Sequence, residues 1–121
     1  MITFCSLSQV KHYKSDINIL AARYCRSKLK DITHLVELAP SPELFTILKN
    51  CKSIDAFNTH RTRFLKEMDE LVSQEKIKII CTALDEGLDV TVSCFCSDRN
   101  LCHTKFLADI FENKGYEVVL I

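Results

Sequence analysis

The chain has 121 residues, of which 47% are hydrophobic and 26% are charged, and its 16 basic side chains balance 16 acidic ones. This composition is typical of a globular protein and excludes disordered and collagen-like chains, so we expect a single domain over residues 1–121. A formal net charge of zero argues against nonspecific binding to duplex nucleic acid and against binding to an anionic membrane surface.

Two strands are predicted in the first part of the chain. Residues 2–5 form a short apolar run, and residues 16–22 alternate and then become apolar enough for a strand that is covered on both faces. The polar stretch between them, residues 6–15, indicates a turn or a short helix. Arg23 follows the second strand at its C-terminal end. Residues 24–37 give a weak signal, which we interpret as loop with partial helix.

Three helices are predicted in the middle of the chain. The first begins at residues 41–43, where serine can cap free N–H groups, proline suits the first helical turn and glutamate favours the positive end of the helix dipole. Ser53 offers a second cap. Apolar residues then recur at three- and four-residue steps over residues 54–71, which predicts one long amphipathic helix. A third helix is predicted over residues 74–86, with Gly87 as its left-handed stop.

The last part of the chain predicts a strand, a helix and a strand. Residues 89–96 are typical of a strand. A helix follows from residue 101 or 102 to residue 113 and is closed by Gly115, and residues 116–121 form the final strand. Because this order is that of a parallel crossover, we expect an α/β sheet of two or three layers.

Several polar and thiol side chains are expected at one edge of this sheet. Ligands bind parallel sheets beyond the C-terminal ends of the strands, which is where Arg23, Cys94 and Cys96 are predicted to lie. Side chains two residues apart on a strand share a face. We therefore expect Cys94 and Cys96 to point the same way, and Phe95 to point into the opposite layer.

Cys102 and His103 begin the helix that follows this strand. The first turn of a helix carries free N–H groups and a positive partial charge, which lower the pKa of a thiol and can hold an anion. Cys102 is therefore the candidate for a reactive thiolate, and His103 is a candidate general base or a hydrogen-bonding group for substrate. Adjacent helical residues diverge by about 100 degrees, so a direct contact between the two does not follow from their spacing.

The chain has seven cysteines, and only Cys94, Cys96 and Cys102 are grouped. No apolar run is long enough to cross a bilayer and no signal peptide is recognisable, so we expect a cytoplasmic protein. In a reducing compartment grouped thiols stay free, ligate metal or do chemistry. The other cysteines are expected to be small buried residues rather than a disulfide framework; they are Cys5, Cys25, Cys51 and Cys81.

Two other interpretations of the cysteine cluster stay open. The thiols can be buried core residues beside a surface imidazole. They can also form a zinc site with Cys94, Cys96, Cys102 and His103 as ligands, although the spacing lacks the paired Cys-x2-Cys knuckles of structural zinc fingers. We predict no cofactor, with zinc as the less favoured alternative.

The segment Cys94-Phe95-Cys96-Ser97-Asp98-Arg99-Asn100-Leu101-Cys102-His103, followed by an amphipathic helix and a short strand, resembles the C-terminal signature of the bacterial and phage family called domain of unknown function 488 (DUF488). That family typically has a strand ending in cysteine, a polar turn, and Cys-His-Arg at the start of a helix. The N-terminal half is also similar to one branch of the family, in residues 2–7, in the strand ending at Arg23 and in the turn at residues 38–40.

The resemblance implies a small Rossmann-like α/β domain with a mostly parallel central sheet flanked by helices. It also implies a pocket lined by residues matching Arg23, Cys94, Cys102 and His103. Two positions depart from the family pattern: Thr104 stands where arginine is usual, and Cys96 stands where glutamate is frequent. The loss of a cation and of a carboxylate puts anion binding and acid–base catalysis in doubt.

Our leading hypothesis is an enzyme that acts on a nucleotide, a nucleic-acid component or another small anionic substrate. Its catalytic residues are expected to be Cys102, His103 and Cys94, and its ligand-binding residues Arg23, Cys96 and Thr104. The alternative is a catalytically degenerate interaction protein, such as an accessory factor or a phage-type inhibitor of a host complex. It would bind a protein partner through its surface, at the basic run near Arg26 or at the helix that carries His60, Arg61 and Arg63.

Overall fold

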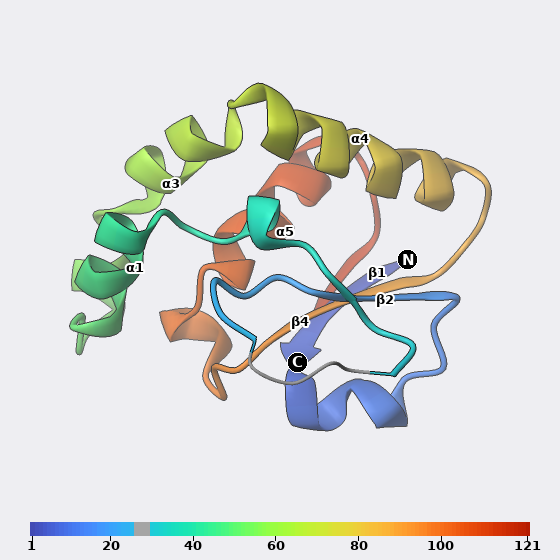
Figure 1. Ribbon diagram of the computed structural model, residues 1–121, viewed down its shortest axis with the longest axis horizontal. Coiled ribbons are helices and arrows are strands. Elements are labelled where there is room, and N and C mark those ends of the chain that lie inside the picture. Colours follow the sequence, from blue (N-terminus) through green and yellow to red (C-terminus); the bar gives the residue numbers. More distant parts are fainter. Residues whose placement is uncertain (26–29) are drawn as a thin grey trace.

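The computed structural model describes residues 1–25 and 30–121, and its described residues form one five-stranded parallel sheet in the order β3-β2-β4-β1-β5 (Figure 1). The fold is thus the Rossmann-like α/β class expected from the sequence, and the sheet is parallel throughout. The strands are β1 (Ile2–Ser6), β2 (Ile17–Leu20), β3 (Thr33–His34), β4 (Val90–Cys94) and β5 (Val118–Leu120).

The two central strands, β1 and β4, are buried along their whole lengths. Their register runs from Ile2 opposite Val90 to Ser6 opposite Cys94. Parallel sheets are covered on both faces, which explains why neither strand exposes an alternating polar face to water. Cys94 is the last residue of β4 and therefore lies at the carboxyl edge of the sheet.

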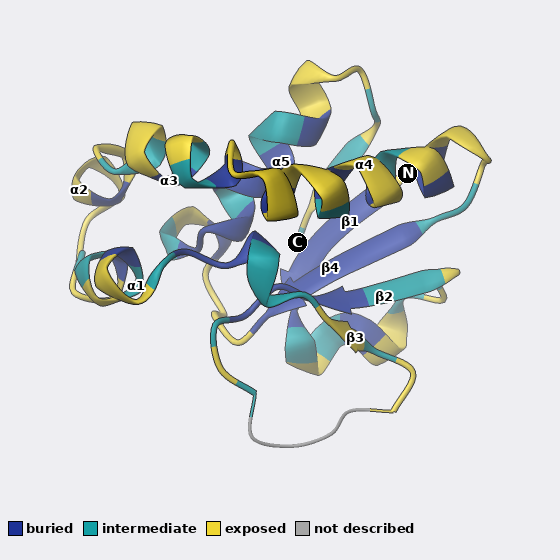
Figure 2. Ribbon diagram, turned by 45° about the horizontal axis from the view of Figure 1, so that its top comes forward, coloured by how far each residue is buried: buried dark blue, intermediate teal, exposed yellow. Residues whose placement is uncertain are grey.

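The helices are divided unequally between the two faces of the sheet (Figure 2). One face packs against a continuous apolar core to which all the α-helices contribute, and the other is covered by the 3-10 helix η1 (Leu7–His12). Two further 3-10 helices are η2 (Val36–Leu38) and η3 (Arg99–Leu101). The α-helices are α1 (Pro42–Lys49), α2 (Ile54–Asn58), α3 (Arg61–Met68), α4 (Leu71–Asp85) and α5 (Thr104–Asn113).

The local start and stop signals in the sequence are confirmed. Ser41 caps α1 by accepting a hydrogen bond from the Leu44 N–H at 3.3 Å, and Ser53 caps α2 in the same way. α4 and α5 are followed by Gly87 and Gly115, with φ of 86° and 93°, the left-handed conformation that glycine adopts without a steric penalty.

The single long helix predicted over residues 54–71 is wrong. The helix is interrupted between α2 and α3, where the backbone of His60 has φ −95° and ψ 3°. The break lets Phe57 of α2 and Phe64 of α3 both pack on Phe106 of α5, with ring centroids 5.0 Å and 5.7 Å away. Packing against a distant helix has overridden the local periodicity.

The weak signal of residues 24–37 hid a short strand. β3 pairs with β2 and is only two residues long, so it is too short to produce a recognisable alternation of apolar and polar residues. Arg26 and Lys28 of the predicted basic run lie outside the described residues. None of the helices in the described part of the chain is long and apolar enough to span a membrane.

Candidate active site

A cavity of about 450 Å³ lies at the carboxyl ends of β2 and β4. Its walls come from the residues after β2, from α1 and α2, and from the turn between β4 and α5. Five of the residues predicted from the sequence line this cavity, namely Arg23, Cys94, Cys96, Cys102 and His103. Thr104, the sixth, is fully buried and does not line it.

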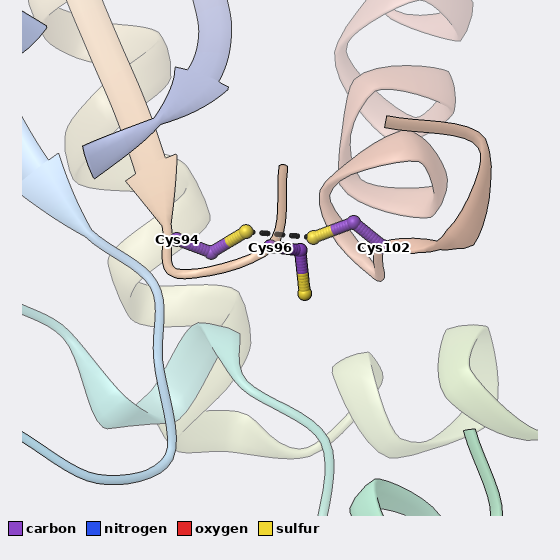
Figure 3. Close-up of side chains that lie close together, drawn as sticks. All are labelled: Cys94, Cys96 and Cys102. Atoms are coloured by element: carbon purple, nitrogen blue, oxygen red, sulfur yellow. Dashed lines mark hydrogen bonds between the residues drawn. The ribbon is translucent and has the colours of Figure 1, made fainter. Parts of the chain in front are cut away.

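The three thiols of the turn lie close together (Figure 3). The Sγ atoms of Cys94 and Cys102 point toward each other and are 2.7 Å apart, and both residues are buried. Cys96 is exposed, and the three sulfur atoms all lie within 4.8 Å of one another. The convergence predicted from the sequence is therefore present, with one thiol facing the solvent.

The backbone route to this arrangement differs from the prediction. β4 ends at Cys94, so Cys96 lies in a loop, and Phe95 is 59% exposed rather than packed in the opposite layer. α5 begins at Thr104, two residues later than Cys102, which has the extended values φ −132° and ψ 141°. The thiols meet because the turn folds back on the end of β4.

Arg99 is the site residue that sequence reasoning missed. Its side chain is only 8% exposed, although it lies in a short polar turn where an arginine is normally solvated. Nη1 donates to Thr104 Oγ1 at 2.6 Å and to the sulfur atoms of Cys94 and Cys102 at 3.4 Å and 3.7 Å. Nη2 donates to the carbonyl oxygen of Cys96. The only available signal was its place between the cysteines of the turn.

The guanidinium of Arg99 remains charged despite its burial. Burial by itself lowers the pKa of Arg99, but the charges of Cys102 and Cys94 raise it above the usual value. A fixed cation therefore lies beside the buried sulfur atoms. The cation that seemed to be lost with arginine at position 104 is supplied from position 99, and the hydroxyl of Thr104 accepts a hydrogen bond from it.

Cys102 is a thiol of the turn whose pKa is lowered. Burial would raise its pKa, yet hydrogen bonds from Cys94, Cys96 and both the side chain and the N–H of Thr104 hold that pKa well below the usual value. The pKa of Cys96 is raised, because its hydrogen bonds to the other two sulfur atoms favour the protonated form. The surroundings of Cys102 thus favour its thiolate form.

His103 is held in one tautomer by the end of β2. Its Nε2 lies 2.6 Å from the carbonyl oxygen of Ala21, and because a carbonyl only accepts, Nε2 carries the proton. Nδ1 then carries no proton and lies 3.8 Å from Cys102 Sγ, so it can accept a proton from a bound molecule but does not donate to the sulfur. Burial lowers the pKa of His103, so the ring is neutral. The contact that spacing alone left open is present.

The sulfur atoms lie close enough together to ligate one metal ion. The guanidinium of Arg99, however, donates to two of them and already supplies the positive charge that a metal would supply. The arrangement therefore favours a thiolate paired with a cation. Zinc binding stays the less favoured alternative, and metal analysis of protein purified without chelators checks it: stoichiometric zinc supports it, and its absence removes it.

Comparison with known families gives one result. The family model DUF488-N3a, described as the active DUF488-N3 subclade, matches residues 2–115, which include the whole turn from Cys94 to His103. No curated protein and no solved structure matches the chain. Since the family match extends over nearly the full length and includes the site, the chain belongs to the DUF488 family.

Proposed function

We propose that this protein is an enzyme that acts on a small anionic molecule, a mononucleotide or a related base-containing anion, through nucleophilic attack by Cys102. The observation that carries the proposal is the set of donors around Cys102 Sγ at the wall of the cavity. A thiolate is the nucleophilic form of cysteine, and a site that keeps it charged is typical of covalent catalysis.

His103 has the geometry of a general base for the second half of such a reaction. In the first half, a bond forms between Cys102 Sγ and the electrophilic atom while the bond to the leaving group breaks, and the leaving group keeps the electron pair. In the second half, water attacks the covalent intermediate, Nδ1 of His103 accepts a proton from that water, and the thiolate leaves. The low pKa of His103 then favours release of the proton to solvent.

The walls of the cavity support an anion that carries a flat ring. Arg23 and Lys49 are cationic, and Tyr24, Phe45 and Phe95 present aromatic surfaces. Tyr24 and Phe95 are 61% and 59% exposed, so their rings are available for stacking. A cavity of about 450 Å³ is in the range of roughly 300–1,000 Å³ that small-molecule sites occupy.

Two points favour an enzyme over an interaction protein that has lost its catalytic groups. Arg99 provides a buried cation beside Cys102, although Thr104 stands where the family usually has arginine. The matching family model is described as the active subclade.

The test measures ligand binding by calorimetry with 5′-mononucleotides and the matching nucleosides. We expect mononucleotides to bind more tightly than nucleosides. Arg23→Ala should weaken the binding of mononucleotides about tenfold, which is the effect of losing one charge-assisted hydrogen bond. Arg63→Ala is the matched control, because Arg63 is an exposed arginine on α3, outside the cavity. Absence of binding to every probe, or equal binding by wild type and Arg23→Ala, contradicts the substrate class.

A second measurement addresses the nucleophile. We expect Cys102 to react with iodoacetamide faster than the exposed Cys96, as mapped by mass spectrometry, because thiolates and not thiols are alkylated. Faster labelling of Cys96 contradicts the assignment. A stoichiometric protein partner that binds Cys102→Ala as tightly as wild type favours the interaction protein instead.

A further inference from the structure

We infer that Cys94 and Cys102 form a redox pair, which a hydroperoxide converts to a disulfide and a small thiol converts back. The inference of a redox pair is based on the geometry of the two sulfur atoms. Its consequence, that oxidation reversibly blocks the nucleophile, rests on the proposed function.

The two sulfur atoms are already in contact. Their separation of 2.7 Å is about 0.7 Å longer than a disulfide bond, so only a small shift joins them. Cys94 is fixed by its place in the central strand β4, and Cys102 by the turn that packs on it. Both side chains are at most 2% exposed, which keeps bulky thiols and oxidised partners away from them.

The oxidation proceeds in two balanced steps. The Cys102 thiolate attacks the terminal oxygen of the hydroperoxide; an S–O bond forms, the O–O bond breaks, and the alkoxide leaves with the electron pair and takes up a proton from solvent. Cys102 is then a sulfenic acid. The Cys94 sulfur attacks the Cys102 sulfur; the S–S bond forms, the S–O bond breaks, and the hydroxide leaves as water with the Cys94 proton. The two thiols lose two electrons, and the hydroperoxide becomes an alcohol and water.

Arg99 assists both steps through contacts that are already made. Its Nη1 lies within 3.7 Å of each sulfur atom. The positive charge favours the thiolate that begins the reaction, and it stays close to the oxygen that leaves in the second step. The cavity that Cys94 and Cys102 share gives a small hydroperoxide access to them.

Cys96 is the competing partner, and the structure disfavours it. Its Sγ lies off the line that joins the other two sulfur atoms (Figure 3) and only within 4.8 Å of them, whereas the Sγ atoms of Cys94 and Cys102 are 2.7 Å apart. Its carbonyl oxygen is held by Arg99 Nη2, so the backbone there cannot move toward Cys102 without losing that hydrogen bond. Cys96 is expected to remain a thiol while the pair is oxidised.

The experiment treats fully reduced protein with hydrogen peroxide, blocks the remaining thiols and maps the peptides by mass spectrometry. Trypsin cuts the unfolded chain after Arg99, between the two cysteines, so a disulfide is recognised as a linked pair of peptides. Fragmentation between residues 94 and 96 then identifies the bonded cysteine. We expect Cys94 linked to Cys102, Cys96 blocked as a thiol, and full recovery of both thiols with dithiothreitol.

Two variants sharpen the result. Cys96→Ser is expected to form the same disulfide, whereas in Cys94→Ser the Cys102 sulfenic acid has no partner and advances to sulfinic acid. A Cys96–Cys102 link in the wild type, or sulfinic acid at Cys102 while Cys94 stays free, overturns the inference. Alkylation of Cys102 in reduced protein tests the nucleophile separately. If Cys102 is alkylated fast but no disulfide forms, only the redox pair is contradicted. If the disulfide forms but Cys102 is alkylated slowly, only the proposed nucleophile is contradicted.

Discussion

Arg99 has more polar contacts with the site than any residue predicted from the sequence. Its partners are a hydroxyl, two sulfur atoms and a carbonyl oxygen, contributed by four other residues of one turn. The sequence could point to the cysteines and to His103 because their types and grouping are unusual. It could not point to Arg99, because a charged residue in a polar turn is normally exposed, and only the folded turn shows that it is enclosed.

Replacing Arg99 by methionine is therefore expected to destabilise the protein. The change keeps an apolar chain but leaves the Cys102 thiolate without its buried cation, so the free energy of unfolding should fall by about 3 kcal/mol. Urea denaturation measures it. The exposed Arg63→Met on α3 is the control and should change stability by less than about 0.5 kcal/mol. Equal effects of the two substitutions contradict the role given to Arg99.

The alkylation of Cys102 should depend on pH in an unusual way. Its pKa is held well below the usual value, so the iodoacetamide rate should begin to fall at a lower pH than the rate of an ordinary thiol. N-acetylcysteine, whose rate falls below its own pKa, is the reference. In Thr104→Val, which removes the hydroxyl donor but keeps the N–H, the rate should begin to fall at higher pH. A wild-type profile that follows the reference rules out the stabilised thiolate.

His103 should make the fold sensitive to acid. Its folded pKa is lower than its unfolded value of about 6.5, so the unfolded chain binds a proton first, and stability falls as pH drops below about 6.5. The slope from this residue is at most about 1.4 kcal/mol per pH unit. Cys102 also lowers the stability as pH falls. Its folded pKa is below its unfolded pKa, so the stability that it contributes is lost as pH falls through the folded pKa.

A variant separates the two contributions to acid sensitivity. In His103→Gln, the glutamine side chain can still donate a hydrogen bond to the Ala21 carbonyl oxygen, but it does not take up a proton. Denaturant unfolding at a series of pH values should give a shallower decline below pH 6.5 for His103→Gln than for the wild type. If the wild type and His103→Gln lose stability in parallel below pH 6.5, His103 does not contribute to the acid sensitivity of the fold.

At the scale of elements, the cavity depends on how α1 is fixed to α3. The carboxylate of Glu67 on α3 accepts hydrogen bonds from the backbone N–H and the hydroxyl of Ser41, at 2.8 Å and 2.6 Å. Ser41 also caps α1, the helix that contributes Phe45 and Lys49 to the cavity wall. One serine thus begins a helix and anchors it to its neighbour.

Ser41→Ala should cost about 1 kcal/mol, the usual loss for a helix cap. Because Ser41 and Glu67 belong to one hydrogen-bond network, the double variant Ser41→Ala with Glu67→Gln should be less destabilised than the sum of the single variants, by at least about 0.5 kcal/mol. Urea denaturation of the four proteins completes the cycle. Additive effects would show that the two groups do not act together.

The elements that the sequence predicted correctly are those with local signals. The caps at Ser41 and Ser53 and the stops at Gly87 and Gly115 need only their own neighbours, and all are present. The break between α2 and α3 depends on Phe106, which is remote in the chain. Residues 54–71 keep a helical apolar period across that break, so periodicity could not locate it.

At the scale of the whole molecule, the site exists because of the order of the strands. β2 and β4 are neighbours in the sheet, although the described part of the chain between them forms β3, the 3-10 helix η2 and four α-helices. Their adjacency brings Arg23, after β2, to the same cavity as Cys94, at the end of β4. The general behaviour of parallel sheets made this meeting predictable without knowledge of the strand order, because all the strands end at one edge.

The hydrogen bond from His103 to the Ala21 carbonyl oxygen couples the two sides of the cavity mechanically. Ala21 is two residues before Arg23, so a ligand that pulls on the Arg23 side chain strains the same short stretch of backbone that aims the imidazole. The hydrogen bond holds the imidazole ring to the residue directly after β2. If Arg23 holds the ligand as proposed, ligand recognition and the orientation of the imidazole depend on the same three residues of backbone.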